Sequence, residues 1–290
     1  MTRKGYLGFL AILPLFVIAF TLMQDSDAAK SEGTPLLRTG TVGSPVCGDS
    51  LCAEITSTSM HEDTMESKSM EGGFTYQQDF LKKEILELDL KKTALFITDP
   101  QNDFLSEGGA AWALVGEQVV ADKVVEHQVM LREAAKKVGI PVFYSPHMYT
   151  EMDYKNWQSL NAIDKLMFEI DMFHQGTWGH EFHPDMIPDD NTIVMNPHKG
   201  LSNFWAGDAV IQLREYGIET LILTGMSANL CVESHTRDAI ENGFDVIIIA
   251  DATAGAGPLA KKAALINYEF IAHEVTTTDD IIKRLHEAAK

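Results

Sequence analysis

From Lys91 onward, short apolar runs alternate with amphipathic stretches, and this alternation constrains the fold more than any other feature of the chain. Short β-rich runs separated by segments of helical period are typical of parallel strands that are connected by helices. We therefore expect an α/β fold with three layers, in which a mostly parallel sheet carries helices on both faces. The predicted strands are 94–98, 141–145, 192–195, 220–224 and 246–250, with 274–277 as a candidate sixth, and the predicted helices are 119–137, 208–216, 231–242, 258–272 and a C-terminal segment to 289.

The segment before the alternating region begins with a pattern that is typical of export. Two basic residues precede an uncharged apolar stretch at 6–23, and the small residues Ser26 and Ala28 follow it at the spacing of a signal-peptidase site. The 18 residues of this stretch also reach the lower limit for a membrane span. We predict that 1–28 is either a signal peptide, which makes the protein periplasmic or secreted, or an uncleaved N-terminal membrane anchor.

Residues 29–75 show neither the helix period nor the strand period. They are rich in Ser, Thr, Glu, Met and Gly, and they predict a disordered acidic linker ahead of a single domain at 76–290. Cys47 and Cys52 lie in this linker, where an oxidising compartment would allow them to pair. Whether these two cysteines form a disulfide stays open, and paired or free they belong to the linker and not to the catalytic site.

The charge of the chain excludes several kinds of partner. The chain has 42 acidic and 23 basic residues, a formal net charge of −19, so phosphate-rich partners such as DNA and RNA are disfavoured. Its three cysteines are too few for a disulfide-rich scaffold of this length. A small-molecule partner fits this composition better than a nucleic acid does.

Reactive side chains follow two of the predicted strands. Asp99 ends the first strand, and Cys231 lies shortly after the fourth, where a helix is expected to begin. Ligands of parallel sheets bind at the carboxyl ends of the strands, so both residues fall at the expected ligand edge. Backbone N–H groups at a helix start would lower the pKa of a thiol and could bind an oxyanion. The alternatives are a small buried hydrophobe for Cys231 and a local cap for Asp99.

Three segments in this arrangement resemble those of the isochorismatase-like cysteine hydrolases. They are DPQNDF at 99–104, GMSANLCVE at 225–233 and DAT at 251–253, and the resemblance extends over about residues 92–285. It implies a six-stranded parallel sheet, a homo-oligomer and hydrolysis of a small amide, carbamoyl or ureide substrate through a thioester. It also implies a triad of Asp99, Lys199 and Cys231 that needs no cofactor and no metal.

The same resemblance implies an oxyanion hole formed by the backbone N–H groups of Ser227 and Cys231, with a cis peptide bond between Met226 and Ser227. The basic member of the triad is less regular. The family usually has lysine four residues before a serine that is followed by x-Phe, and here His198 has that spacing to Ser202.

Lys199 follows one residue later, and it is the predicted basic member because a loop can absorb one residue and because its charge is permanent. His198 is the alternative.

Aromatic residues near these motifs predict a small apolar pocket, although bulky aromatics are also ordinary core residues. The predicted pocket residues are Phe104, Trp112, His198, Phe204 and Trp205.

Three further histidines, His174, His180 and His183, could form a metal site. The alternative is that they are ordinary surface or loop histidines.

Two other functions stay open at this point. A vinyl ether hydrolase with the same fold would not need Cys231, so the presence of that residue argues against it. A non-catalytic binding domain on a membrane tether is the second alternative, but it has no use for a carboxylate, a base and a thiol at one sheet edge.

Overall fold

The computed structural model describes residues 85–290. The predicted signal peptide or anchor at 1–28, the linker at 29–75 and the domain start at 76 all lie outside the described residues. Within the described part, no helix has both the length and the apolar character that a membrane crossing requires.

Six strands form one sheet in which every neighbouring pair is parallel. The strand order is β3-β2-β1-β4-β5-β6, and this confirms the predicted α/β fold with a six-stranded parallel sheet. The strands are β1 (Thr93–Thr98), β2 (Val142–Ser145), β3 (Thr192–Val194), β4 (Thr220–Met226), β5 (Asp245–Ala254) and β6 (Glu274–Thr276).

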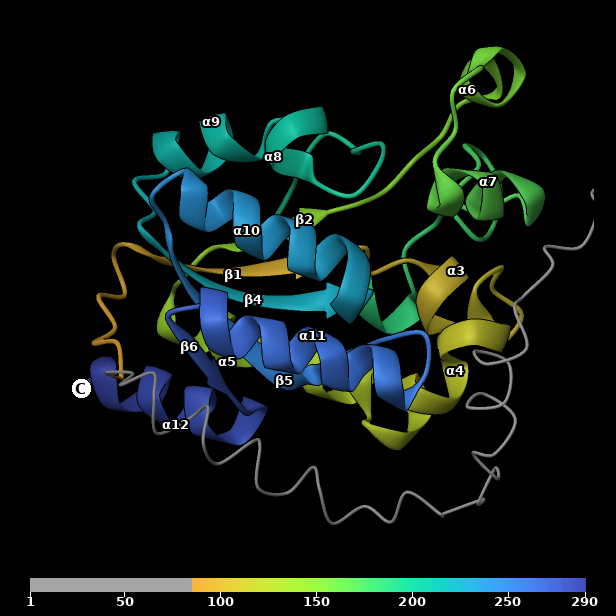
Figure 1. The fold of residues 1–290 in the computed structure, drawn as a ribbon. Helices are drawn as coiled ribbons and strands as arrows, with labels where there is room; N and C mark the ends of the chain where they lie inside the picture. The colour runs from red at the N-terminus through yellow and green to blue at the C-terminus, as the bar shows by residue number, and fades with distance from the viewer. Residues whose placement is uncertain (1–84) are drawn as a thin grey trace, which may run out of the picture. The chain divides into compact units, whose positions relative to one another are not determined.

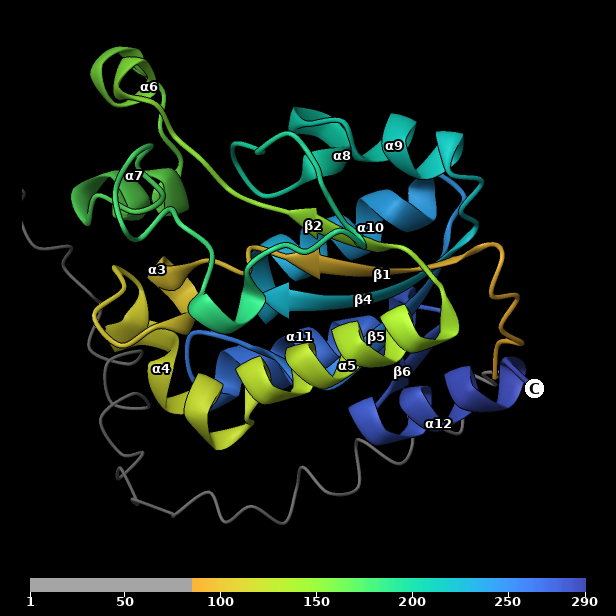
Figure 2. The same ribbon diagram turned by 180° about the vertical axis from the view of Figure 1, so that it is seen from behind.

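Helices cover both faces of the sheet (Figures 1 and 2). The longer helices are α4 (Trp112–Ala121), α5 (Val124–Val138), α7 (Ala162–Glu169), α9 (Ala209–Glu215), α10 (Glu233–Glu241), α11 (Pro258–Ile271) and α12 (Thr278–Ala288). In Figure 1, α10 and α11 lie in front of the sheet, and in Figure 2, α5 and α12 lie in front of it. The shorter elements are α3 (Asn102–Leu105), α6 (Glu151–Asn156), η2 (Pro184–Met186), α8 (Asn203–Ala206) and η3 (Ala228–Val232).

Two apolar cores lie on opposite faces of the sheet, because successive strand residues point to opposite faces. On β1, Leu95 and Ile97 join the core beneath α5 and α12, whereas Ala94 and Phe96 join the core beneath α9, α10 and α11. All four side chains are buried. Each fully buried large aliphatic or aromatic side chain stabilises the fold by about 1.5–3 kcal/mol, which explains why the central strands are continuous apolar runs.

One predicted helix is divided in the structure. The segment 119–137 belongs partly to α4 and partly to α5, and the two helices meet at Lys123, whose φ of +50° is left-handed. A left-handed residue ends the regular helical path. The sequence has no glycine or proline at this point, so the break carries no ordinary signal.

The sheet brings the carboxyl ends of β1 and β4 together at its centre. The chain returns from β3 at one edge to β4 beside β1, and such a reversal of strand order is where parallel sheets bind ligands. Gly225 pairs with Thr98 in this region and has a φ of +117°. A Cβ at Gly225 would lie 2.2 Å from the Thr98 carbonyl oxygen, so only glycine permits this close approach.

Candidate active site

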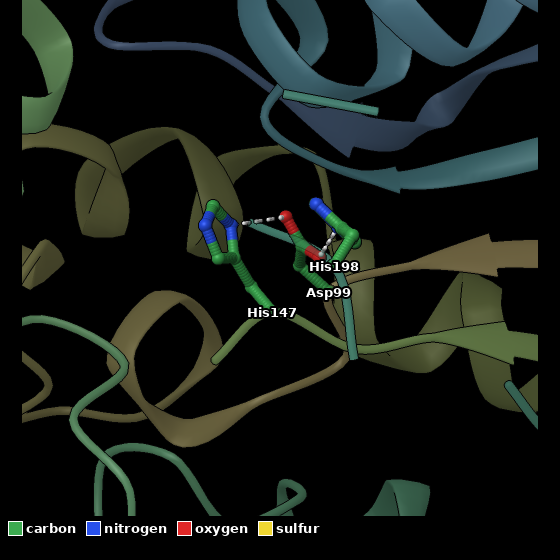
Figure 3. A group of neighbouring side chains, drawn as sticks. All are labelled: Asp99, His147 and His198. Carbon is green, nitrogen blue, oxygen red and sulfur yellow. Dashed lines mark hydrogen bonds and ion pairs between the residues drawn. The ribbon is translucent and has the colours of Figure 1, made fainter. Parts of the chain in front are cut away.

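Asp99 follows β1 in a left-handed conformation, with a φ of +48°, and its side chain is fully buried. His198 Nε2 lies 2.9 Å from Asp99 Oδ1, and His147 Nδ1 lies 3.8 Å from Oδ2 (Figure 3). Burial opposes ionisation of the carboxyl group, but attraction from His198 and His147 outweighs it and holds the pKa of Asp99 well below its ordinary value. The carboxylate therefore accepts the hydrogen bond, and His198 donates it.

Backbone pairing beyond β2 and β3 explains why His198 reaches Asp99. His147 and His198 form a parallel bridge past the ends of these strands, and the His198 N–H donates to the Pro146 carbonyl at 2.9 Å. In such an extended pairing, adjacent residues point to opposite sides. His198 points to β1, so Lys199 points away from it.

Lys199 does not join Asp99, contrary to the predicted triad. Its Nζ donates to Asp153 Oδ2, and it lies 6.0 Å from the centroid of the Trp157 ring. Asp153 is the N-terminal capping partner of α6, so Lys199 ties that helix to the loop after β3. Of the two adjacent candidates, His198 is the neighbour of Asp99 and Lys199 is not.

Cys231 lies in η3, which leads directly into α10, and only 3% of its surface is exposed. Burial, and then the negative charge of Asp99, raise the pKa of its thiol well above the ordinary value. The backbone N–H groups of Ser227 and Cys231 act in the opposite direction but are outweighed. The expected lowering of this pKa by the helix start is therefore wrong, because desolvation and a nearby carboxylate are stronger than the local N–H groups.

The peptide bond between Met226 and Ser227 is cis, as the family resemblance implies. Ser227 is buried and precedes η3, and its backbone N–H acts on the Cys231 sulfur together with that of Cys231 itself. The two predicted oxyanion donors therefore lie beside the same sulfur atom.

Two residues that the sequence did not assign to the site hold its parts in place. His235 Nδ1 lies 2.6 Å from the Cys231 carbonyl oxygen, and its Nε2 accepts a hydrogen bond from the Asn203 N–H at 3.0 Å. Gln101 binds the backbone of His147 through both ends of its amide, at 2.7 and 2.9 Å. Gln101 could have been assigned to the site from its place within the segment 99–104. His235 could have been assigned to it from its position one turn after Cys231.

The buried histidines predict that acid destabilises the fold. Burial, with repulsion from His198, lowers the pKa of His147 to about 4 and that of His235 to about 3. Both values lie below the about 6.5 of an unfolded histidine, so the unfolded state binds more protons and stability falls as the pH drops below about 6.5. At pH 5, each histidine should cost about 2 kcal/mol of unfolding free energy relative to pH 8.

Urea unfolding between pH 8 and pH 5 measures this loss. His235→Gln should reduce the slope of stability against pH, since it removes one of the two buried groups. An unchanged slope in this variant would contradict the assignment.

A narrow cavity of about 70 Å³ lies against Cys231, Ser227 and His147, and Phe104 is one of its lining residues.

The other aromatic residues that were predicted to line the pocket lie elsewhere. Phe204 packs in the core against Phe96, Trp112 packs against the core at the start of α4, and Trp205 is 83% exposed. The predicted pocket is wrong in these residues, because α8, which carries Phe204 and Trp205, packs beside α9 and α10 and not over the cavity. His198 contacts Asp99 and does not line the cavity.

Asp99, His147 and His198 offer ligand atoms within 4.8 Å of one another, and they are residue types that bind zinc. A nitrogen that donates a hydrogen bond has no lone pair for a metal, so His198 Nε2 is not a ligand while it donates to Asp99. His147 Nδ1, His147 Nε2 and His198 Nδ1 have no hydrogen-bond partner among the described residues, so the cluster is suited to transfer a proton or to bind a metal. Among residues 85–290, the three histidines of the alternative metal site, His174, His180 and His183, do not gather into a possible metal cluster.

A buried carboxylate, an imidazole and a thiol at the carboxyl edge of a parallel sheet define an α/β enzyme with the groups needed for hydrolysis. The comparisons with known proteins agree. The model of the Isochorismatase domain matches residues 93–280, and the chain belongs to the isochorismatase family of hydrolases. The predicted family and its enzyme class are thereby confirmed.

Among the similar proteins, ureidoacrylate amidohydrolase RutB of Caulobacter vibrioides is 30% identical over 212 residues, which cover 69% of this chain and 93% of that protein. RutB of Pseudomonas syringae is 31% identical over 212 residues, covering 69% of this chain and 86% of the relative. A crystal structure of a cysteine hydrolase from Pseudomonas syringae pv. phaseolicola superimposes with a TM-score of 0.63 at 22% identity, over 72% of this chain and 99% of that one. This structural likeness shows the fold.

Proposed function

We propose that this chain hydrolyses the C–N bond of a small amide, carbamoyl or ureide compound through a thioester on Cys231. The observation that carries the proposal is the buried Asp99, which accepts a hydrogen bond from His198 and whose negative charge raises the pKa of the Cys231 thiol. The ureidoacrylate amidohydrolases to which the chain is similar act on a ureide, and this supports the same bond class here.

The first half-reaction begins with a protonated thiol, because the raised pKa of Cys231 keeps it neutral at rest. Asp99 Oδ2 is buried and has no hydrogen-bond partner within the described residues, so it is the acceptor for the thiol proton. The sulfur attacks the carbonyl carbon as the proton leaves, and a C–S bond forms. Asp99 then gives the proton to the leaving nitrogen, the C–N bond breaks, and ammonia or an amine departs.

The negative charge on the carbonyl oxygen needs donors in the intermediate. The backbone N–H groups of Ser227 and Cys231 lie beside the sulfur and are placed to serve as these donors. One such donor is worth about 10²–10³ in rate in a comparable hydrolase. His198 holds Asp99 through Oδ1, which leaves Oδ2 free for the proton.

The second half-reaction releases the acid. Water attacks the thioester carbonyl, Asp99 takes a proton from the water, and the C–S bond breaks. The proton returns to sulfur, so the carboxylate and the thiol are restored. The sum is one amide and one water converted into one carboxylic acid and one amine or ammonia.

The two alternative functions make poorer use of this arrangement. Vinyl ether hydrolysis needs no thiol, yet Cys231 lies beside both Asp99 and the cavity. A pure binding domain gains nothing from burying a carboxylate oxygen that has no hydrogen-bond partner among the described residues, which costs free energy.

The thioester is tested by trapping it. Ammonia release from a panel of small amides and ureides identifies a substrate, and an acid quench during turnover should then leave the acyl group on the peptide that contains Cys231. Mass spectrometry should show this added mass, and hydroxylamine should remove it. Turnover that persists with no acylated peptide at any quench time would overturn the thioester.

A further inference from the structure

The cavity beside Cys231 has almost no polar surface at all. Thirteen of its sixteen lining residues are apolar, and the other three are His147, Ser227 and Cys231, which belong to the site already described. Every polar group of the lining is therefore at the reactive end. Most of the remaining wall comes from α4, α7 and the segments after α7 and before α8, with Phe104, Leu230 and Ala256 completing it.

The described residues that line this cavity include no lysine and no arginine. Lys165 is adjacent to the lining residue Leu166 on α7, but it is exposed and does not line the cavity. Lys199 binds Asp153 and lies in a different groove, which it shares with Trp205 and Arg237. A substrate carboxylate in the cavity would lose its water and find no cation. Burial of an unpaired charge is strongly unfavourable, so such a substrate is rejected.

We infer that this site selects substrates whose acyl group is short, apolar and uncharged, an inference that rests on the proposed function. The cavity of about 70 Å³ is small and enclosed by apolar side chains, which favours a short acyl chain over a long one. A short aliphatic acyl chain fits both its size and its lining.

A pair of amides with the same number of non-hydrogen atoms isolates the charge. Isovaleramide and malonamate both present a CH₂ beside the amide, followed by an isopropyl group in the first and a carboxylate in the second. The full-length protein should hydrolyse isovaleramide with a kcat/KM at least about 10²-fold higher than that for malonamate. Ammonia release measures both rates.

A cation placed in the cavity wall should weaken the preference for the uncharged amide. Leu114 lines the cavity and is 47% exposed, so Leu114→Arg introduces a charge without burying it completely. This variant should lower the ratio of isovaleramide to malonamate turnover at least about tenfold. Leu259 is 79% exposed on α11 and does not line the cavity, so Leu259→Arg is the matched control and should leave the ratio unchanged.

The outcomes separate this inference from the proposed function. Hydrolysis of malonamate as fast as that of isovaleramide, or faster, would overturn the apolar selection and leave the amide hydrolase standing. An unchanged ratio of isovaleramide to malonamate turnover in Leu114→Arg would show that the apolar wall of the cavity does not select the substrate. If no amide or ureide of the panel turned over, the proposed function would fall and the inference with it.

Discussion

Cys231→Ala is expected to lower kcat/KM for any amide substrate by about 10³-fold or more, with the fold retained. The proposed reaction has no other nucleophile, since the described part of the chain contains this one cysteine. The side chain is small and buried, so its truncation should change the free energy of unfolding by no more than about 1–2 kcal/mol. Ammonia release gives the rate, and urea unfolding gives the stability.

Cys231→Ser is the matched variant, because it keeps the size of the side chain and replaces the thiol with a less acidic hydroxyl. It should also lose about 10³-fold in kcat/KM, since Asp99 would have to accept a proton from a much weaker acid. Activity within tenfold of wild type in either variant would show that sulfur is not the nucleophile. If that residual activity were abolished by EDTA, a metal-activated water at Asp99, His147 and His198 would replace the thiol mechanism.

The sheet was predictable because its strands are short apolar runs, buried on both faces and spaced by helical segments. All six predicted strands are present within a few residues of their expected bounds. The segments 151–169 and 203–206 were not predicted as helices, because elements of four to eight residues carry too little periodicity. The walls of the cavity come partly from α7, so the lining of the site could not be predicted from the motifs.

Asp99 and Cys231 could be placed from the sequence because the ends of neighbouring parallel strands meet at one edge. The basic partner could not, since it depends on which of two adjacent residues faces the sheet after β3. That orientation is set by the pairing of His147 with His198, which lies outside the regular strands. The exposure of Trp205 could not be predicted either, because it depends on how the four residues of α8 pack on their neighbours.

His198→Gln is expected to lower kcat by about 10²–10³-fold, whereas Lys199→Gln should change it less than about threefold. His198 acts through Asp99 as a positioning residue, because its Nε2–H holds Oδ1 and keeps the carboxylate ionised. Lys199 binds Asp153 and has a partly exposed side chain, so its loss should cost at most about 1 kcal/mol of stability. Steady-state kinetics on both variants, with urea unfolding to confirm the fold, measures the contrast.

A merely structural role for His198 would give a different set of results. The proposed role predicts that kcat falls while KM stays near wild type, because His198 does not line the cavity. His198→Lys should recover at least tenfold over His198→Gln, since a lysine ammonium group is a charged donor for Asp99. A loss in Lys199→Gln as large as that in His198→Gln would instead return the basic role to Lys199. Equal losses in His198→Lys and His198→Gln would mean that the shape of the imidazole matters and its bond to Asp99 does not.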